Sequence, residues 1–80
     1  MKAKEMFENL GYKLDTQDEF GILYAKEILD KNTFGYVDSE MIYYDFEYTT
    51  IYFTNKDNVN FYLLKAINKQ VEELGWNNEK

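Results

Sequence analysis

Carboxylates are the side chains in this sequence whose spacing comes nearest to that of a catalytic pair. Asp45 and Glu47 are two residues apart in a strand-like segment, which would place their carboxyl groups roughly 6.5–7 Å apart on one face. Acid and base carboxylates of glycosidases have a similar separation. The same spacing arises in any alternating acidic strand, and the sequence identifies no pocket around this pair. We therefore interpret it as a solvated face.

The chain lacks the residues on which most other active sites depend. It has no Cys and no His, which excludes disulfides, thiolate nucleophiles, imidazole proton transfer and metal binding by either residue. All nine basic residues are Lys, and the single Ser, Ser39, has no His to activate it. The acidic run Asp15–Glu19 lacks the Asp/Asn alternation of a calcium loop, and the residues around it lack the Gly and the terminal Glu of such a loop at the required positions. We predict that the protein is not an enzyme and has no catalytic, cofactor-binding or metal site.

Length and charge limit the remaining classes. Eighty residues are enough for one small domain, which we place at residues 1–76, with a frayed tail at 77–80. The net charge of -6 and the scattered Lys residues oppose direct binding to nucleic acid. No segment approaches about 18 apolar residues, and residues 1–12 lack the apolar region of a signal peptide. We expect a cytoplasmic protein that binds neither nucleic acid nor a membrane.

Two segments have the apolar spacing of amphipathic helices. The stripe of the first, a short N-terminal helix, consists of Ala3, Met6, Phe7 and Leu10. The stripe of the second, a longer C-terminal helix, consists of Leu63, Leu64, Ile67, Val71 and Leu74. Its start has three candidate capping residues, Asp57, Asn58 and Asn60. Helices this short need tertiary packing, so we expect both to dock on a sheet.

Both helical patterns end in the same way, with Glu-x-Leu-Gly-aromatic at residues 8–12 and 72–76. The spacing predicts a left-handed Gly11 and Gly75, with Tyr12 and Trp76 folding back on the preceding helix. The alternative is that the two copies form a repeated binding motif. The acidic residues in these last turns oppose the helix dipole. They are either solvated, with Lys69 offsetting Glu72 or Glu73, or part of a patch for a basic partner.

Between the helices the apolar period changes to two, which is typical of strands. In residues 41–46, Ile42, Tyr44 and Phe46 face one way, while Met41, Tyr43 and Asp45 face the other. Residues 51–54 alternate again. A four-residue loop would place Phe46 opposite Ile51 and Tyr44 opposite Phe53, so that the more apolar sides coincide. We expect an antiparallel hairpin here.

Upstream, residues 20–29 also have strand character. A turn-forming cluster follows at residues 30–33, and strand character resumes at 34–37. The pattern does not decide which face of 20–29 is buried, and residues 12–14 form a candidate edge strand. The predicted fold is α+β: an N-terminal helix, a three- or four-stranded antiparallel sheet and a C-terminal helix, with both helices on one sheet face.

The sheet face opposite the helices is the candidate interface. Aromatic residues make up 19% of the chain and include eight Tyr, a residue suited to half-exposed positions at a partner surface. The candidate interface residues are Met41, Tyr43, Asp45, Tyr52 and Thr54. Tyr and Met are enriched in protein interfaces, and the partner is either an unknown protein or a second copy. The alternative is that these tyrosines serve only in cross-strand packing.

The two ends of the chain resemble small uncharacterised proteins encoded by phages and prophages of low-G+C bacteria. These proteins begin with a pattern like M-x-A-K-E-x-F-E-x-L-G-Y and end with one like L-L-K-A-I-N-K-Q-x-E-E-L-G-W. The matching segments here are MKAKEMFENLGY and LLKAINKQVEELGW. The resemblance implies a phage or prophage context and no known activity. We expect an accessory protein of this uncharacterised class in the bacterial host cytoplasm. We expect it to act by protein–protein interaction, with an acidic nucleic-acid mimic that inhibits a host defence protein as the alternative.

Overall fold

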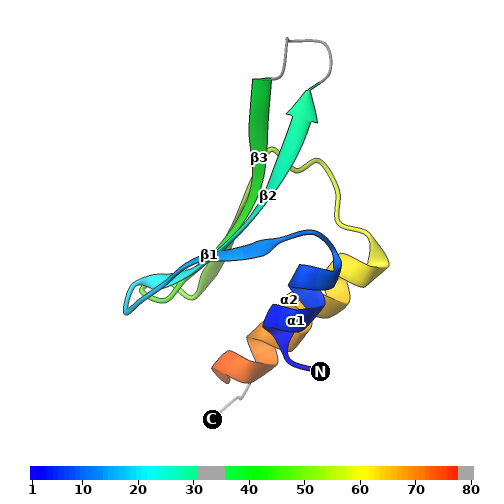
Figure 1. Ribbon diagram of the computed structural model, residues 1–80. Helices are drawn as coiled ribbons and strands as arrows, with labels where there is room; N and C mark the ends of the chain where they lie inside the picture. Colours follow the sequence, from blue (N-terminus) through cyan, green and yellow to red (C-terminus); the bar gives the residue numbers. More distant parts are fainter. Residues whose placement is uncertain (31–35, 78–80) are drawn as a thin grey trace.

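The computed structural model describes residues 1–30 and 36–77 and shows the predicted α+β fold (Figure 1). The elements in chain order are α1 (Ala3–Asn9), β1 (Lys13–Gln17), β2 (Gly21–Asp30), β3 (Tyr36–Asp45), β4 (Thr50–Thr54) and α2 (Phe61–Leu74). The strands form one antiparallel sheet in the order β1-β2-β3-β4. Both helices lie on the same side of the sheet, which leaves the other side uncovered.

The core between the sheet and the helices is built around aromatic side chains. Phe7 of α1 stacks on Tyr24 of β2 at 4.0 Å between ring centroids, and Tyr24 meets the ring of Tyr44 edge-on at 6.4 Å. Two hydroxyl groups attach α2 to the sheet: Tyr24 donates to Gln70 Oε1 at 2.6 Å, and Tyr44 donates to the Ile67 carbonyl at 3.2 Å. Burial raises the pKa of Tyr44, so this buried phenol stays neutral.

The repeated Glu-x-Leu-Gly-aromatic segments are helix endings, as predicted. Gly11 and Gly75 have φ angles of 92° and 75°, a left-handed conformation that favours Gly. Tyr12 N donates to the Phe7 carbonyl, and Trp76 N donates to the Val71 carbonyl, which is the hydrogen bond of a Schellman ending. The ring of Tyr12 packs edge-on against Phe7 at 5.9 Å. The second copy has the same backbone hydrogen bond, but its ring does not follow the prediction: Trp76 packs against Tyr44 and Phe46, with ring centroids 5.9 and 6.3 Å away.

The acidic helix ends have structural partners. Glu73, at the end of α2, accepts a hydrogen bond from Ala3 N at 2.7 Å. This places its carboxylate at the N-terminus of α1, where the helix dipole favours an anion. Glu72 forms the expected ion pair with Lys69, at 3.5 Å. Glu73 therefore helps to hold the two helices together.

The buried stripe of α2 differs from the predicted one. It consists of Leu63, Ala66, Ile67 and Gln70, at i, i+3, i+4 and i+7. Leu64, which was expected in the stripe, is 45% exposed, and Val71 and Leu74 are only partly buried. The expected stripe was drawn from the large apolar residues. It missed Ala66, which is small, and Gln70, which is polar but satisfied by Tyr24. Of the predicted caps, Asn60 is the one used, accepting from Leu63 N.

The β3–β4 hairpin has the predicted faces but a different register. Tyr44 lies opposite Ile51 and Ile42 opposite Phe53, so the predicted pairs of Phe46 with Ile51 and Tyr44 with Phe53 are wrong by two residues. The cause is the turn. Asp45 Oδ1 accepts from the backbone N of Glu47 and of Tyr48, which closes the loop at residues 46–49. Because a shift of two residues preserves the side-chain faces, the apolar sides still coincide.

The pairing of β2 with β3 shows how the residues before the β3–β4 hairpin are arranged. Residues 36–45 form one continuous strand, where the sequence suggested separate segments at 34–37 and 41–46. The backbones of β2 and β3 pair up to Asp30 and Tyr36, beyond the last partners of β1 and β4, so they project as a two-stranded ribbon (Figure 1). Of the predicted turn at 30–33, only Asp30 lies within the described residues. Phe34 lies outside them, and so does the predicted tail at 77–80 except for Asn77. An edge strand is present near the candidate at 12–14, but it spans Lys13–Gln17 (β1), so it begins after Tyr12 and extends into the acidic run.

Candidate functional site

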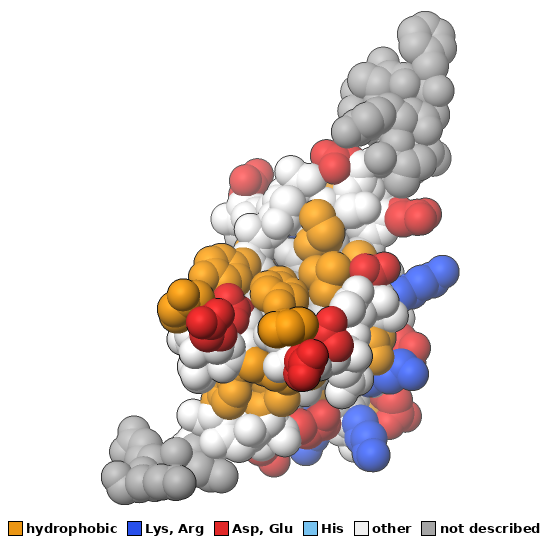
Figure 2. Space-filling model, turned by 90° about the vertical axis from the view of Figure 1, so that its left-hand side faces the viewer, with side chains coloured by type: hydrophobic (Ala, Val, Ile, Leu, Met, Phe, Trp, Pro, Cys, Tyr) orange, Lys and Arg blue, Asp and Glu red, His pale blue; other side chains and the backbone are white. Residues whose placement is uncertain are grey.

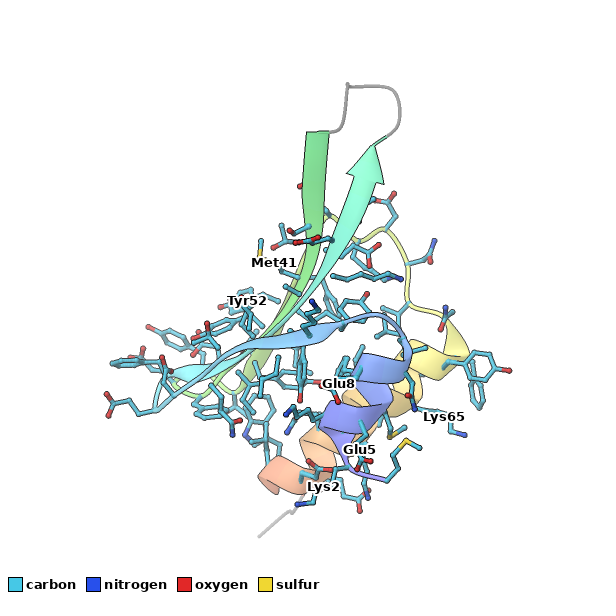
Figure 3. All side chains as sticks on the ribbon, in the orientation of Figure 1. Lys2, Glu5, Glu8, Met41, Tyr52 and Lys65 are labelled. Carbon is cyan, nitrogen blue, oxygen red and sulfur yellow. The ribbon has the colours of Figure 1, made fainter. Side chains whose placement is uncertain are left out.

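The uncovered side of the sheet carries a contiguous apolar surface, which we call the open face. Its residues are Leu23 and Ala25 of β2, Met41 and Tyr43 of β3, and Tyr52 of β4. They are adjacent because Leu23 pairs with Tyr43, Tyr43 with Tyr52, and Ala25 with Met41. Figure 2, which looks at this side, shows apolar side chains gathered over the sheet. In Figure 3, Met41 and Tyr52 point away from the helices.

Tyr52 is the most accessible aromatic residue of the open face. Its side chain is 49% exposed, and its ring stacks on that of Tyr43 with 6.5 Å between centroids. The register predicted from the sequence, with Tyr44 opposite Phe53, would place Tyr43 opposite Thr54 and Asp45 opposite Tyr52. The structure instead pairs the two tyrosines directly and places Thr54 opposite Met41 and Thr50 opposite Asp45. A stacked tyrosine pair thus forms the centre of the face.

Tyr43 has a structural task besides its place on the open face. Its hydroxyl donates to the Phe20 carbonyl at 3.2 Å, and its ring lies over Gly21, where an added Cβ would come within 2.7 Å of the Tyr43 Cζ and hydroxyl oxygen. Partial desolvation and the carboxylates of Asp45 and Asp18 raise the pKa of Tyr43, so the phenol stays neutral at physiological pH. Tyr43 is therefore tied into cross-strand packing, whereas the Tyr52 side chain is about half exposed.

The carboxylates near the open face form turns and do not form a pair. Glu47 lies in the loop after β3, so the prediction that Asp45 and Glu47 project from one strand face is wrong. Asp45 Oδ1 is occupied by the backbone N of Glu47 and of Tyr48. Asp18 Oδ1 accepts in the same way from the backbone N of Phe20 and of Gly21 in the β1–β2 turn. Each carboxylate satisfies backbone donors of its own turn.

Charge is distributed unevenly between the two sides of the sheet. Figure 2 shows acidic side chains among and around the apolar ones, with the Lys side chains toward the right-hand and lower edges. A shallow hollow of about 440 Å³ adjoins the open face and is lined in part by Lys13, Asp15, Ala25, Glu27 and Ser39. Several other lysines are engaged on the helix side: Lys26 lies over the Tyr12 ring, Lys56 pairs with Glu40, and Lys69 pairs with Glu72. The open face is therefore an apolar centre with a mainly acidic surround.

A polar cluster on the helix side was not predicted. Tyr12 donates to Glu40 Oε2 at 2.6 Å, and Lys56 Nζ lies 3.5 Å from the same oxygen. The Tyr12 hydrogen bond and the charges of Lys56 and Lys26 hold the pKa of Glu40 below its usual range. Burial and the Glu40 carboxylate raise the pKa of Tyr12. The cluster joins Tyr12, just before β1, to Glu40 of β3 and to Lys56, which follows β4. It thereby fixes the base of the β2–β3 ribbon.

The described part of the chain has neither a metal-binding cluster nor a membrane-spanning helix. In residues 1–30 and 36–77, no three acidic side chains come together in a group that could hold a metal ion. Neither helix of these residues has the length and apolar character required to cross a membrane. Comparisons of the chain with protein-family models, with curated proteins and with solved structures found no match.

Proposed function

We propose that this protein is a non-catalytic binding module that recognises another protein through the open face. The observation that carries the proposal is the uncovered apolar centre around the stacked Tyr43–Tyr52 pair. Contiguous apolar surface on a small monomer marks interaction sites. Tyr and Met, both present here, are enriched in interfaces, and Tyr52 can add buried area with little loss of conformational entropy.

The charges around the open face indicate which kind of partner surface would be complementary to it. Asp15 and Glu27 line the hollow beside it, and Asp45 lies at the end of β3. A partner that fits has an apolar centre flanked by Lys or Arg, so that the two potentials are complementary. Ion pairs at such a rim are screened by salt, and binding should therefore weaken as ionic strength rises.

The resemblance of the two chain ends supports a biological setting for this module. We place it among phage or prophage accessory proteins acting in the bacterial cytoplasm, with a host or phage protein as its partner. A second function uses the same face: with its acidic surround, the protein would occupy a basic nucleic-acid-binding site of a host defence protein. The gathering of acidic side chains around the open face favours this candidate.

Capture from a bacterial host lysate with matched variants tests the proposed function. The open-face variant is Met41→Ser/Tyr52→Ser. The control is Tyr62→Ser/Leu64→Ser, which removes two exposed apolar side chains, 68% and 45% exposed, from α2. We expect wild type and control to retain the same partner and the open-face variant to lose at least about 90% of it, as for an interface centre.

Folding and competition controls complete this experiment. All three proteins should melt cooperatively by circular dichroism. A captured partner that the open-face variant retains and the control loses would contradict the proposal. Release of the partner by an added oligonucleotide would identify the second function, and retention would identify binding outside a nucleic-acid site.

A further inference from the structure

The two edges of the sheet differ in how they are protected from pairing with another strand. β1 and β4 are the edge strands. The ladder of β1 shifts register between Leu14 and Thr16, and the strand carries Lys13 and Asp15. Register irregularities and charged residues on an edge strand are devices that prevent the addition of a further strand.

β4 has none of these devices. Its sequence, Thr-Ile-Tyr-Phe-Thr, contains no charged residue, Pro or Gly. All five residues pair with β3 in unbroken register, so no bulge interrupts β4. Asn55, which follows β4, has a φ angle of 58° and donates from its side chain to Asp38 Oδ1 and the Ser39 carbonyl. It thus ends β4 over the neighbouring β3 and does not cover the free edge.

An uncovered apolar side chain on each face accompanies this free edge. Tyr52 lies on the open face and is 49% exposed. Phe53 lies on the helix side and is still 42% exposed. A strand added to β4 would supply neighbours for both side chains.

We propose that the strand added is β4 of a second copy, antiparallel, with a two-fold axis at Tyr52. The sequence of β4 is nearly the same in both directions: Thr50 and Thr54 at the ends, Ile51 and Phe53 next, Tyr52 at the centre. Pairing about Tyr52 places Ile51 opposite the partner's Phe53 on the helix side. It also places Thr50 opposite the partner's Thr54 on the open side. Each pair joins like with like, and no charges meet across the junction.

This pairing would join the two four-stranded sheets into one and place the two open faces side by side. The dimer is independent of the partner binding proposed above, since a monomer also presents the open face. Each copy carries a net charge of -6, so the two copies repel at long range. Salt should therefore strengthen the dimer, whereas it should weaken the binding of a basic partner.

Sedimentation velocity over a range of protein concentrations tests the dimer. Phe53→Lys introduces a charge at the junction, and Phe61→Lys is the matched control, since Phe61 is 65% exposed on α2. We expect wild type and Phe61→Lys to dimerise with the same dissociation constant, and Phe53→Lys to raise it at least about tenfold while keeping the same circular dichroism spectrum. A wild-type protein that stays monomeric at millimolar concentration, or two variants with equal effects, would overturn the proposal.

Single cysteines test the register, and the chain offers a clean background because it has none of its own. Directly opposite residues of antiparallel strands have Cα atoms about 4.5–5.5 Å apart, within disulfide range. Tyr52→Cys should form a covalent dimer on mild oxidation. Thr50→Cys and Thr54→Cys should cross-link to each other when mixed and not to themselves. Self-linking of Thr50→Cys or Thr54→Cys as efficient as that of Tyr52→Cys would contradict the two-fold axis at Tyr52.

Discussion

Removal of the Tyr24 hydroxyl should destabilise the protein through the partner that it leaves behind. Tyr24 donates to Gln70 Oε1 at 2.6 Å, and the two residues are only 2% and 5% exposed. Burial and the carboxylates of Glu73 and Glu8 raise the pKa of Tyr24 to about 12, so the donor stays protonated at neutral pH. This hydrogen bond is one of two buried polar links between the sheet and α2, the other being that of the Tyr44 hydroxyl to the Ile67 carbonyl.

The magnitude follows from the unsatisfied group. Tyr24→Phe leaves Gln70 Oε1 buried without its donor, which costs about 1–3 kcal/mol. Gln70→Leu leaves the Tyr24 hydroxyl buried without its acceptor, and the cost should be similar. Tyr24→Phe/Gln70→Leu replaces both polar groups by apolar ones, and it should cost less than the sum of the single changes by at least about 1 kcal/mol.

Urea unfolding followed by Trp76 fluorescence measures these free energies. Trp76 is the single tryptophan and packs against Tyr44 and Phe46, with ring centroids 5.9 and 6.3 Å away. With a denaturant dependence of about 1 kcal/mol per molar urea for a chain of this size, each single variant should unfold at about 1–3 M lower urea. Strictly additive effects in the double variant would refute a buried hydrogen bond between these residues.

Three further changes probe the backbone and the polar cluster. Gly75→Ala should lower the free energy of unfolding by about 1 kcal/mol, because an alanine is strained at a φ of 75°. Gly21→Ala should lower it by about 3 kcal/mol, because the added Cβ would meet Tyr43 and the Tyr44 carbonyl. Urea unfolding measures both changes. The pKa of Glu40 is lower in the folded chain than its ordinary value of 4.5. Its contribution is therefore present above that pH and lost as pH falls through the folded-state pKa. Glu40→Gln should thus reduce the decline of the melting temperature between about pH 5 and pH 3, and an unchanged decline would contradict the role assigned to Glu40.

Local rules were sufficient to predict the helix endings and the sheet faces. A left-handed Gly and the hydrogen bonds of its Schellman ending depend on residues adjacent in sequence, so Gly11 and Gly75 were predicted correctly. Alternation with period two likewise assigned Tyr43 and Tyr52 to one face, where the structure places them. The register between those strands depended on a side chain, Asp45, that closes the turn one residue earlier than the apolar pattern suggested.

The apolar pattern of the sequence could not predict contacts between residues that are far apart in the chain. Leu23 and Ala25 belong to the open face because β2 pairs with β3, and the sequence of β2 alone did not distinguish its faces. The Tyr12–Glu40 hydrogen bond joins residues that are 28 positions apart. A stripe drawn from large apolar residues favoured Leu64, while the packed α2 uses Gln70, whose polarity is compensated by a tyrosine 46 positions away.

A photo-crosslinking amino acid placed in the open face tests most directly whether this surface binds a partner. The probe is p-benzoylphenylalanine at Met41, which points away from the helices (Figure 3). The control carries the same probe at Tyr62 on α2. Expressed in a bacterium, the setting proposed above, and irradiated, the protein with the probe at position 41 should form an adduct with another protein, and its mass separates this adduct from a self-linked dimer. An adduct formed from position 62 and not from position 41 would contradict binding through the open face.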